Sequence, residues 1–283
     1  MVGTANLPRV LFEDIVRQAI LEDLGRGGDL TTDSIVDPGA QFFGRIVARQ
    51  AGRLAGGGIA ALVFEMMDSS VRIVQTLAEG TALEPGATLL TVEGPARAIL
   101  GAERTALNFL GRLSGIATLT ATYVEAVAGT GAGIVCTRKT TPGLRALEKY
   151  AVRCGGGANH RFGLDDAVLI KDNHLAVAGS IEEAVARVRR NIGHTVKVEL
   201  EVDTLRQLEQ ALVVGVDIVL LDNMKPEILR KAVEMVGGRV ITEASGGINL
   251  ETAAEIAATG VDHLSVGALT HSAPCLDVGL DAG

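Results

Sequence analysis

The second half of the chain alternates short apolar runs with helical patterns, and this alternation limits the possible folds more than any other feature. Six runs have the length and composition of strands: Ile134–Cys136, Ala167–Ile170, Val196–Val202, Asp217–Leu221, Arg239–Glu243 and His263–Val266. Helical periodicity fills intervals between them, near Ser180–Asn191, Leu205–Val213, Pro226–Val236 and Leu250–Thr259. Short strands joined by crossover helices are typical of a parallel sheet.

Glycine-containing loops follow these strands and favour a closed β/α barrel over an open sheet. The active site of such a barrel lies at the C-terminal ends of its strands. Because only six strands are clear, the pattern does not establish a complete eight-stranded barrel.

The N-terminal part of the chain predicts a small α/β domain on a mixed or antiparallel sheet. Apolar residues recur at helical spacing over Leu11–Leu24, where Gly25 ends the helix. In the loop that follows, Asp29 is interpreted as a helix cap or turn residue. The remaining elements are a helix at Gly58–Met67 and strands at Phe42–Arg49, Val71–Leu77 and Thr88–Val92.

A long helical pattern connects the two halves. Pro95 opens it at a first-turn position, and the pattern continues over Ala96–Val127. Small residues around Gly111–Gly115 predict a break within it.

Cations concentrate in one segment of an otherwise acidic chain. The whole sequence has 26 Lys and Arg against 34 Asp and Glu, a net charge of −8. Within Arg138–Lys171, seven cations meet three anions, a balance of +4. Cations in loops that follow strand ends are what a site for a polyanionic small molecule requires.

The positions of these cations separate two interpretations. Arg138 and Lys139 follow one strand, His160 and Arg161 follow a glycine run, and Lys171 closes another strand. A solvated basic face is the alternative, and only Leu144–Val152 has the spacing that it requires. We therefore interpret three cations as surface or supporting residues: Arg145, Lys149 and Arg153.

Two acidic positions are candidates for binding a metal or sugar hydroxyls. Val196–Val202 alternates strictly, which places Lys197, Glu199 and Glu201 on one face. Helices cover the outside of a parallel barrel, so we expect these charges to point inward. Asp222 follows the next strand, and a cap for the helix at Pro226–Val236 is its alternative role.

Two glycine turns follow the last two strands. They comprise Ser245, Gly246 and Gly247, before a helix expected near Asn249, and then Gly267 with Ala268. Backbone N–H groups of such turns and a helix N-terminus form a phosphate cradle in β/α barrels. His271, in the next loop, is equally compatible with a structural and a catalytic role.

The motifs TRKTTPGLR, KYAVRCGGGANHR and LIKDNH resemble quinolinate phosphoribosyltransferase, and with later matches the likeness covers nearly the whole chain. The resemblance implies an α/β protein of the type II phosphoribosyltransferase fold, with an N-terminal α/β sandwich-like domain and an incomplete parallel β/α barrel. The domains are expected at residues 1–115 and 116–273, and the tail 274–283 is expected to return to the first domain.

The activity implied by the resemblance is phosphoribosyl transfer from phosphoribosyl pyrophosphate to quinolinate. Decarboxylation follows and gives nicotinate mononucleotide, pyrophosphate and CO₂, in NAD biosynthesis. The resemblance also implies Mg²⁺ and a homodimer, in which Arg104 of one subunit reaches its neighbour's site. Higher oligomers stay open.

The resemblance assigns roles to the candidate residues. Arg138, Arg161 and the neighbouring subunit's Arg104 are expected to bind the quinolinate carboxylates, with His160 and Lys171 beside them. The catalytic group comprises Lys139, Lys171, Glu201 and Asp222. Lys139 and Lys171 reach the pyrophosphate, whereas Asp222 and Glu201, less surely Glu199, hold ribose hydroxyls or Mg²⁺. The two glycine turns and His271 are expected around the 5-phosphate.

Composition excludes several other classes. The acidic balance argues against nucleic acid or an anionic membrane as the main partner, and 3% aromatic residues supply no stacking platform. No apolar run approaches the ~18 residues of a membrane span, and we see no signal peptide. Three scattered cysteines fit reduced thiols in a cytoplasm.

Three alternatives stay open at this point. A molybdenum-operon relative shares the architecture, although we expect it to lack the intact RCGGGANHR run. Nicotinate phosphoribosyltransferase would handle a monocarboxylate and couple to ATP hydrolysis. A barrel without activity could instead bind a phosphorylated metabolite as a regulator.

Overall fold

The computed structural model describes residues 7–75 and 77–283. The chain packs into two compact units, and the first comprises Met1–Ala121, Thr140–Gly156 and Leu269–Gly283. The second comprises Thr122–Lys139 and Gly157–Ala268. The first unit thus also contains a segment from the middle of the chain, inside the range 116–273 expected for the barrel domain.

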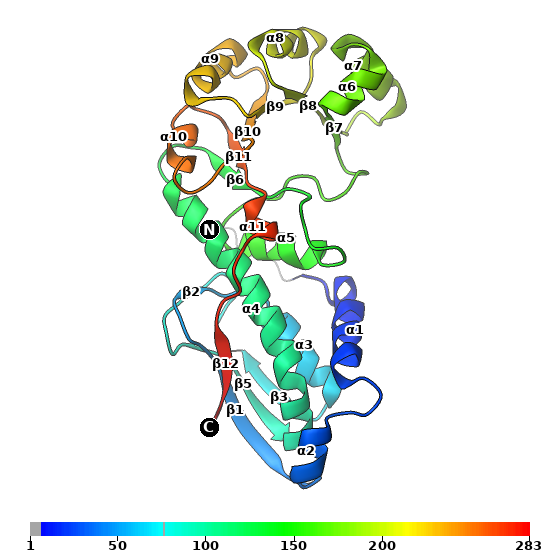
Figure 1. Ribbon diagram of the computed structural model, residues 1–283, viewed down its shortest axis with the longest axis vertical. Coiled ribbons are helices and arrows are strands. Elements are labelled where there is room, and N and C mark those ends of the chain that lie inside the picture. Colours follow the sequence, from blue (N-terminus) through cyan, green and yellow to red (C-terminus); the bar gives the residue numbers. More distant parts are fainter. Residues whose placement is uncertain (1–6, 76) are drawn as a thin grey trace. The chain divides into compact units, whose positions relative to one another are not determined.

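The first unit is built on an antiparallel sheet of four strands (Figure 1). Its order is β12-β1-β5-β3: Val278–Ala282, Gln41–Ala48, Thr88–Pro95 and Arg72–Gln75. A two-stranded ribbon pairs β2 (Gly52–Arg53) with β4 (Ala82–Leu83). Thr76, which belongs to the strand expected at Val71–Leu77, lies outside the described residues.

Six helices accompany this sheet: η1 (Arg9–Leu11), α1 (Glu13–Leu24), α2 (Leu30–Ile35), α3 (Gly57–Met67), α4 (Ala96–Ala126) and α5 (Arg145–Cys154), of which η1 is a 3₁₀ helix. Asp29 caps α2 by accepting a hydrogen bond of 3.0 Å from the Thr32 N–H, so its interpretation as a cap is confirmed. Ile46 and Leu90 of the sheet and Phe64 of α3 are fully buried, and they belong to the core of this unit.

The break expected in the long helix is wrong, because α4 runs without interruption over Ala96–Ala126. A Cβ atom on Gly115 would lie 1.9 Å from the carbonyl oxygen of Pro274. One on Gly111 would lie 2.9 Å from that of Leu276, whose N–H donates to the Gly111 carbonyl at 2.8 Å. The small residues thus let the C-terminal segment lie directly on the helix, on its way to pair with β1.

The second unit is a curved sheet of six parallel strands, in the order β6-β11-β10-β9-β8-β7. Their bounds, in chain order from β6 to β11, are Gly133–Val135, Val168–Ile170, Val198–Val202, Ile218–Asp222, Ile241–Ser245 and His263–Ser265. All six predicted strands are therefore confirmed within a few residues. Among the described residues the end strands β6 and β7 are not paired with each other, so the barrel is incomplete.

Helices cover the outer face of this sheet (Figure 1): α6 (Asp172–Ala178), α7 (Ile181–Asn191), α8 (Leu205–Val214), α9 (Pro226–Val236) and α10 (Ala253–Ala257). The helix expected at Leu250–Thr259 is shorter than predicted. Asn249 accepts hydrogen bonds from the N–H groups of Glu251 and Thr252, which forms a turn where the first helical residues were expected. A final short helix, α11 (Ala268–His271), follows β11.

Candidate active site

The C-terminal ends of the six parallel strands bring most of the predicted site residues to one edge of the second unit. Parallel strands end on the same side, so residues that follow them in sequence share that side. Most of the predicted site residues of this unit lie on these strands or directly after them: Arg138, Lys139, Lys171, Glu199, Glu201, Asp222, Ser245, Gly246, Gly247, Gly267 and Ala268. His160 and Arg161 follow Ala158, which forms an isolated parallel bridge with Val135 of β6.

Arg138 and Arg161 form a cationic pair in this unit. Burial lowers the pKa of Arg161, and the nearby positive charge of Arg138 lowers it further. The Arg138 Nε atom is buried and has no hydrogen-bond partner among the described residues. Arg161 donates to the Ala167 carbonyl at 3.1 Å, which fixes its side chain. Two like charges brought together in this way are arranged to bind an anion.

His160 lies against two buried glutamates. Its Nε2 atom is 2.9 Å from a carboxylate oxygen of Glu199 and 3.5 Å from one of Glu243. Its Nδ1 atom accepts the backbone N–H of Arg161 at 2.8 Å. Burial raises the pKa of Glu243 to about 7, and the negative charge of Glu199 adds to this effect.

Glu243 was not predicted as a site residue. It belongs to the expected strand Arg239–Glu243, and the alternation of that strand was the signal that could have placed it inside the barrel. In the register of the sheet it lies level with Leu220 of β9 and His263 of β11.

Lys171 forms an ion pair with Glu201, across the neighbouring strands β7 and β8. The Glu201 side chain is 10% exposed, and it shares one face of β8 with Glu199, two residues earlier on the strand. Lys197 does not join them, and the expectation that it points inward is wrong. It precedes β8 and lies 3.2 Å from Asp217, with 64% of its side chain exposed.

Asp222 ends β9 and does not cap the next helix, so the capping alternative is wrong. Helix α9 begins after Lys225 without a side-chain cap. Asp222 instead accepts a hydrogen bond of 2.5 Å from the side-chain amide of Asn223.

The first glycine turn has a steric explanation in its contact with Asn223. Asn223 has a φ of 52° and donates its N–H to the Ser245 carbonyl at 2.9 Å. Gly246 has a φ of 93°, and a Cβ atom there would lie 2.1 Å from the Asn223 side-chain oxygen. The helix expected to begin near Asn249 begins only at Ala253.

Two predicted site residues, Arg104 and His271, belong to the first unit. Arg104 is an exposed residue of α4. His271 ends α11, and its Nδ1 atom lies 2.6 Å from the Ser272 hydroxyl.

The first unit also contains a buried ion pair that the sequence reasoning missed. Arg112 lies 2.7 Å from Glu148, which has no exposed surface and accepts the N–H of Thr141 at 3.0 Å. Lys149, interpreted with Arg145 and Arg153 as a surface or supporting residue, is 2% exposed, so the surface alternative is wrong for Lys149.

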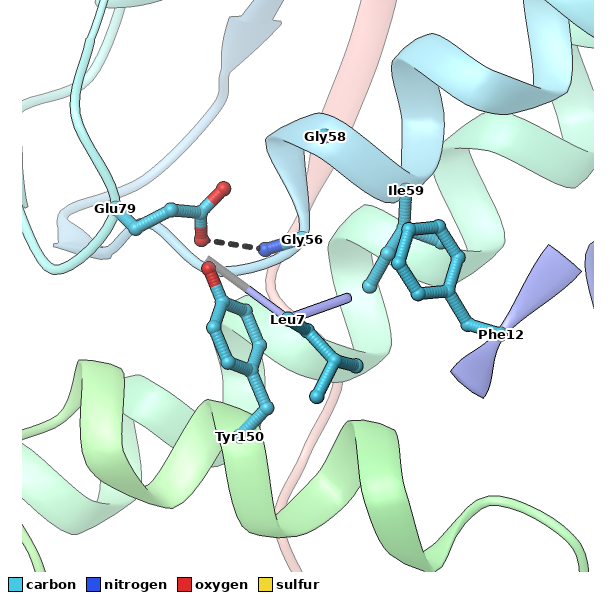
Figure 2. Close-up of a pocket in the computed structure, with 7 residues that line it drawn as sticks. All are labelled: Leu7, Phe12, Gly56, Gly58, Ile59, Glu79 and Tyr150. Atoms are coloured by element: carbon cyan, nitrogen blue, oxygen red, sulfur yellow. Dashed lines mark hydrogen bonds between the residues drawn. The ribbon is translucent and has the colours of Figure 1, made fainter. Parts of the chain in front are cut away.

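A cavity of about 180 Å³ lies in the first unit (Figure 2). None of the predicted site residues lines it, and its walls are Leu7, Phe12, Gly56, Gly58, Ile59, Glu79 and Tyr150. The Glu79 carboxylate accepts the N–H groups of Gly56 and Gly57, each at 2.8 Å, so it caps the start of α3.

Burial, followed by the charge of Glu79, raises the pKa of the Cys154 thiol to about 12, which suits a structural cysteine.

Comparison with known proteins identifies the class to which this fold and site belong. Residues 29–114 match the model of the quinolinate phosphoribosyl transferase N-terminal domain. Residues 116–281 match that of the C-terminal domain. Together the two models cover more than half of the chain, so the chain belongs to the quinolinate phosphoribosyl transferase family.

Individual relatives give the same result. The nicotinate-nucleotide pyrophosphorylase [carboxylating] of Mycobacterium leprae is 47% identical over 95% of this chain and 96% of its own length. A probable enzyme of the same name from Bacillus subtilis is 44% identical over 95% and 93%. The structure of the nicotinate-nucleotide pyrophosphorylase from Francisella tularensis is 37% identical, with a TM-score of 0.95 over 100% of both chains.

The predicted family, fold and enzyme class are thus confirmed. The chain is a phosphoribosyltransferase that acts on quinolinate, in pyridine nucleotide biosynthesis. Among the described residues no helix combines the length and apolar character that crossing a bilayer requires.

Proposed function

We propose that the residues at the C-terminal edge of the parallel sheet bind quinolinate beside phosphoribosyl pyrophosphate. The observation that carries this proposal is the Arg138–Arg161 pair, in which a buried Arg138 Nε atom has no hydrogen-bond partner among the described residues. A planar dicarboxylate offers two anionic groups for two guanidinium forks. Each charge-assisted hydrogen bond contributes roughly 1.5–3 kcal/mol.

The sugar phosphate is proposed to lie next to this pair. Lys139 and Lys171 neutralise the pyrophosphate, while Glu201 and Asp222 hold ribose hydroxyls or the metal. These two carboxylates fit Mg²⁺, a hard cation that binds a few carboxylates together with substrate phosphate oxygens. When bound, Mg²⁺ supplies charge that stabilises the departing pyrophosphate. Glu199 is turned toward His160 at 2.9 Å, which favours Glu201 for this role.

The 5-phosphate is proposed to lie at the two glycine turns. Gly246 and Gly247 have positive φ values, so their backbone can approach an anion closely. The remaining proposed contacts are Ser245, Gly267, Ala268 and His271. With α10 beginning later than expected, backbone N–H groups of the turns supply the contacts in place of a helix N-terminus.

The chemistry requires positioning and neutralisation more than covalent catalysis. As the C1–O bond to pyrophosphate breaks, positive charge grows on the ribose ring while the pyridine nitrogen attacks C1. The bond between C2 and its carboxylate then breaks and CO₂ leaves. The bonding electrons stay on C2, where the adjacent positive nitrogen stabilises them until C2 takes up a proton and the nicotinate ring is formed. No thiol takes part, and Cys136 and Cys154 are both buried.

A homodimer is proposed as the working form, with the exposed Arg104 serving the neighbouring subunit's site. Its position on the surface of α4 makes it accessible to a second chain. A cytoplasmic location is proposed as well, because among the described residues none of the three cysteines forms a disulfide.

The direct test is turnover of purified protein with Mg²⁺, quinolinate and phosphoribosyl pyrophosphate. The expected products are nicotinate mononucleotide, pyrophosphate and CO₂, in equal amounts. Turnover of nicotinate that depends on ATP would support nicotinate phosphoribosyltransferase instead. Tight binding of both substrates without any product would support a metabolite-binding regulator.

A further inference from the structure

His160 is engaged on both of its ring nitrogens by protein groups. Nδ1 accepts the Arg161 N–H at 2.8 Å, so this nitrogen carries no proton. The proton of the neutral ring is therefore on Nε2, which lies 2.9 Å from Glu199 and 3.5 Å from Glu243. A ring held in this way is bound to the protein at both ends.

The two glutamates come from the strands below the loop that carries His160. Glu199 lies on β8 and is 3% exposed, while Glu243 lies on β10 and is 5% exposed. Glu199 Oε1 is buried without a hydrogen-bond partner among the described residues, and so is Glu243 Oε1, the oxygen that lies 3.5 Å from His160 Nε2. Neither carboxylate serves the hydrogen bonding of the neighbouring strands. Because burying a carboxylate costs free energy, the burial of these two points to a role at the site.

Charge balance links the same glutamates to the arginine pair. Arg138 repels Arg161, and the negative charge of Glu199 acts on Arg161 in the opposite direction. The Ser265 hydroxyl donates to the Ala244 carbonyl at 3.3 Å, and His263 lies level with Glu243 in the sheet. Lys171 and Glu201 compensate each other. Glu199 and Asp166 are thus acids whose negative charges act on Arg161, and Glu199 also contacts His160.

We propose that Glu199 and Glu243 are positioning residues of the quinolinate site, which anchor the His160 ring and through it hold Arg161 beside Arg138. The inference rests on the proposed function, because it concerns the pocket that would receive the dicarboxylate. His160 then serves the substrate through the position of Arg161, and Glu199 does not bind ribose or metal.

The main test is the Glu199→Ala variant, measured for both substrates. The dissociation constant of quinolinate, by calorimetry, and its KM should each rise at least about tenfold, the equivalent of one lost hydrogen bond to a charged group. The KM of phosphoribosyl pyrophosphate should change less than about threefold. Glu199→Gln should restore most of the quinolinate affinity, because its amide oxygen still accepts the Nε2–H.

A double-mutant cycle tests whether the glutamates act through the ring. With His160 already replaced by Ala, the Glu199→Ala substitution should weaken quinolinate binding by no more than about twofold. Glu243→Asp is the second variant. Its shorter side chain moves the carboxylate away from the His160 ring and keeps the charge. Glu234→Ala, an exposed glutamate of α9, is the control and should leave both substrates unaffected.

The possible outcomes separate this inference from the proposed function. Equal losses for both substrates, or additive effects in the cycle, would overturn the positioning role. Unchanged quinolinate binding in a folded Glu199→Ala or Glu243→Asp variant would overturn it too. Absence of quinolinate binding by the wild-type protein would instead refute the proposed function itself.

Discussion

At the scale of single residues, the defining feature is a set of charges that the fold keeps close together. Arg138 and Arg161 repel each other, and desolvation lowers the pKa of Arg161. The pKa of Glu243 shifts in the opposite direction, because burial and the negative charge of Glu199 raise it. Such opposing shifts are typical of functional sites, since a fold selected for stability alone would avoid them.

Replacing Arg161 by Ala should reduce kcat/KM for quinolinate by well over tenfold, because one fork of the proposed carboxylate clamp is lost. Steady-state kinetics with varied quinolinate measures the effect, and circular dichroism checks that the fold is intact. Arg230→Ala, which removes an exposed arginine of α9, is the control. Near-wild-type turnover of Arg161→Ala would remove this residue from the site.

The pKa of Glu243 predicts a pH-dependent contribution to stability. The folded-state value is raised from 4.5 to about 7, so the folded protein holds a proton that the unfolded chain has lost. This stabilising contribution is fully present below pH 4.5 and is lost as the pH rises through about 7. At about 1.4 kcal/mol per pKa unit, the loss amounts to about 3–4 kcal/mol.

The Glu243→Gln variant checks this expectation, because its side chain does not titrate. Between pH 5 and pH 8 its melting temperature should rise relative to that of the wild-type protein. Glu234→Gln, at an exposed position, should track the wild type at both pH values. A constant difference between Glu243→Gln and wild type would show that Glu243 does not change its protonation in this range.

At the scale of elements, α4 is the helix whose small residues are explained by what lies against them. Gly115 and Gly111 face the backbone of the C-terminal segment, which passes over the helix before β12. Helix propensity alone would favour alanine at both positions. The close approach of the C-terminal segment leaves no room for the Cβ atom of an alanine at either position.

Gly115→Ala should therefore destabilise the first unit by at least about 1–3 kcal/mol, as overpacking does. The control is Gly58→Ala in α3, where a Cβ atom meets no atom within 4 Å. That substitution should leave the stability unchanged or raise it by up to about 1 kcal/mol. Thermal unfolding of both variants measures the difference, and an equal effect in the two would contradict the packing argument.

At the scale of the whole molecule, the proposed assembly makes each site depend on two chains. Arg104 belongs to the first unit, whereas the other residues proposed for quinolinate belong to the second. In a homodimer with shared sites, each subunit would supply Arg104 to its partner's pocket.

Mixing two inactive variants tests this arrangement. Arg104→Ala and Lys139→Ala should each abolish most of the activity as homodimers. After denaturation and joint refolding, half of the dimers should be mixed, and each should contain one intact site with both residues present. Activity should then return to about a quarter of the wild-type value. No recovery above the separate variants would argue against the shared site.

The sequence by itself determined the class of fold and supplied most of the residues of the proposed site. Apolar periodicity located all six parallel strands, and cations near their ends marked the edge at which we propose that the substrates bind. These features are local, because they depend on residues close together in the chain. The tertiary structure alone decided what depends on distant residues, namely the continuity of α4, the burial of Lys149 and the inward position of Glu243. Each of these follows from which segments pack together, and contacts between distant segments leave no fixed spacing in the sequence.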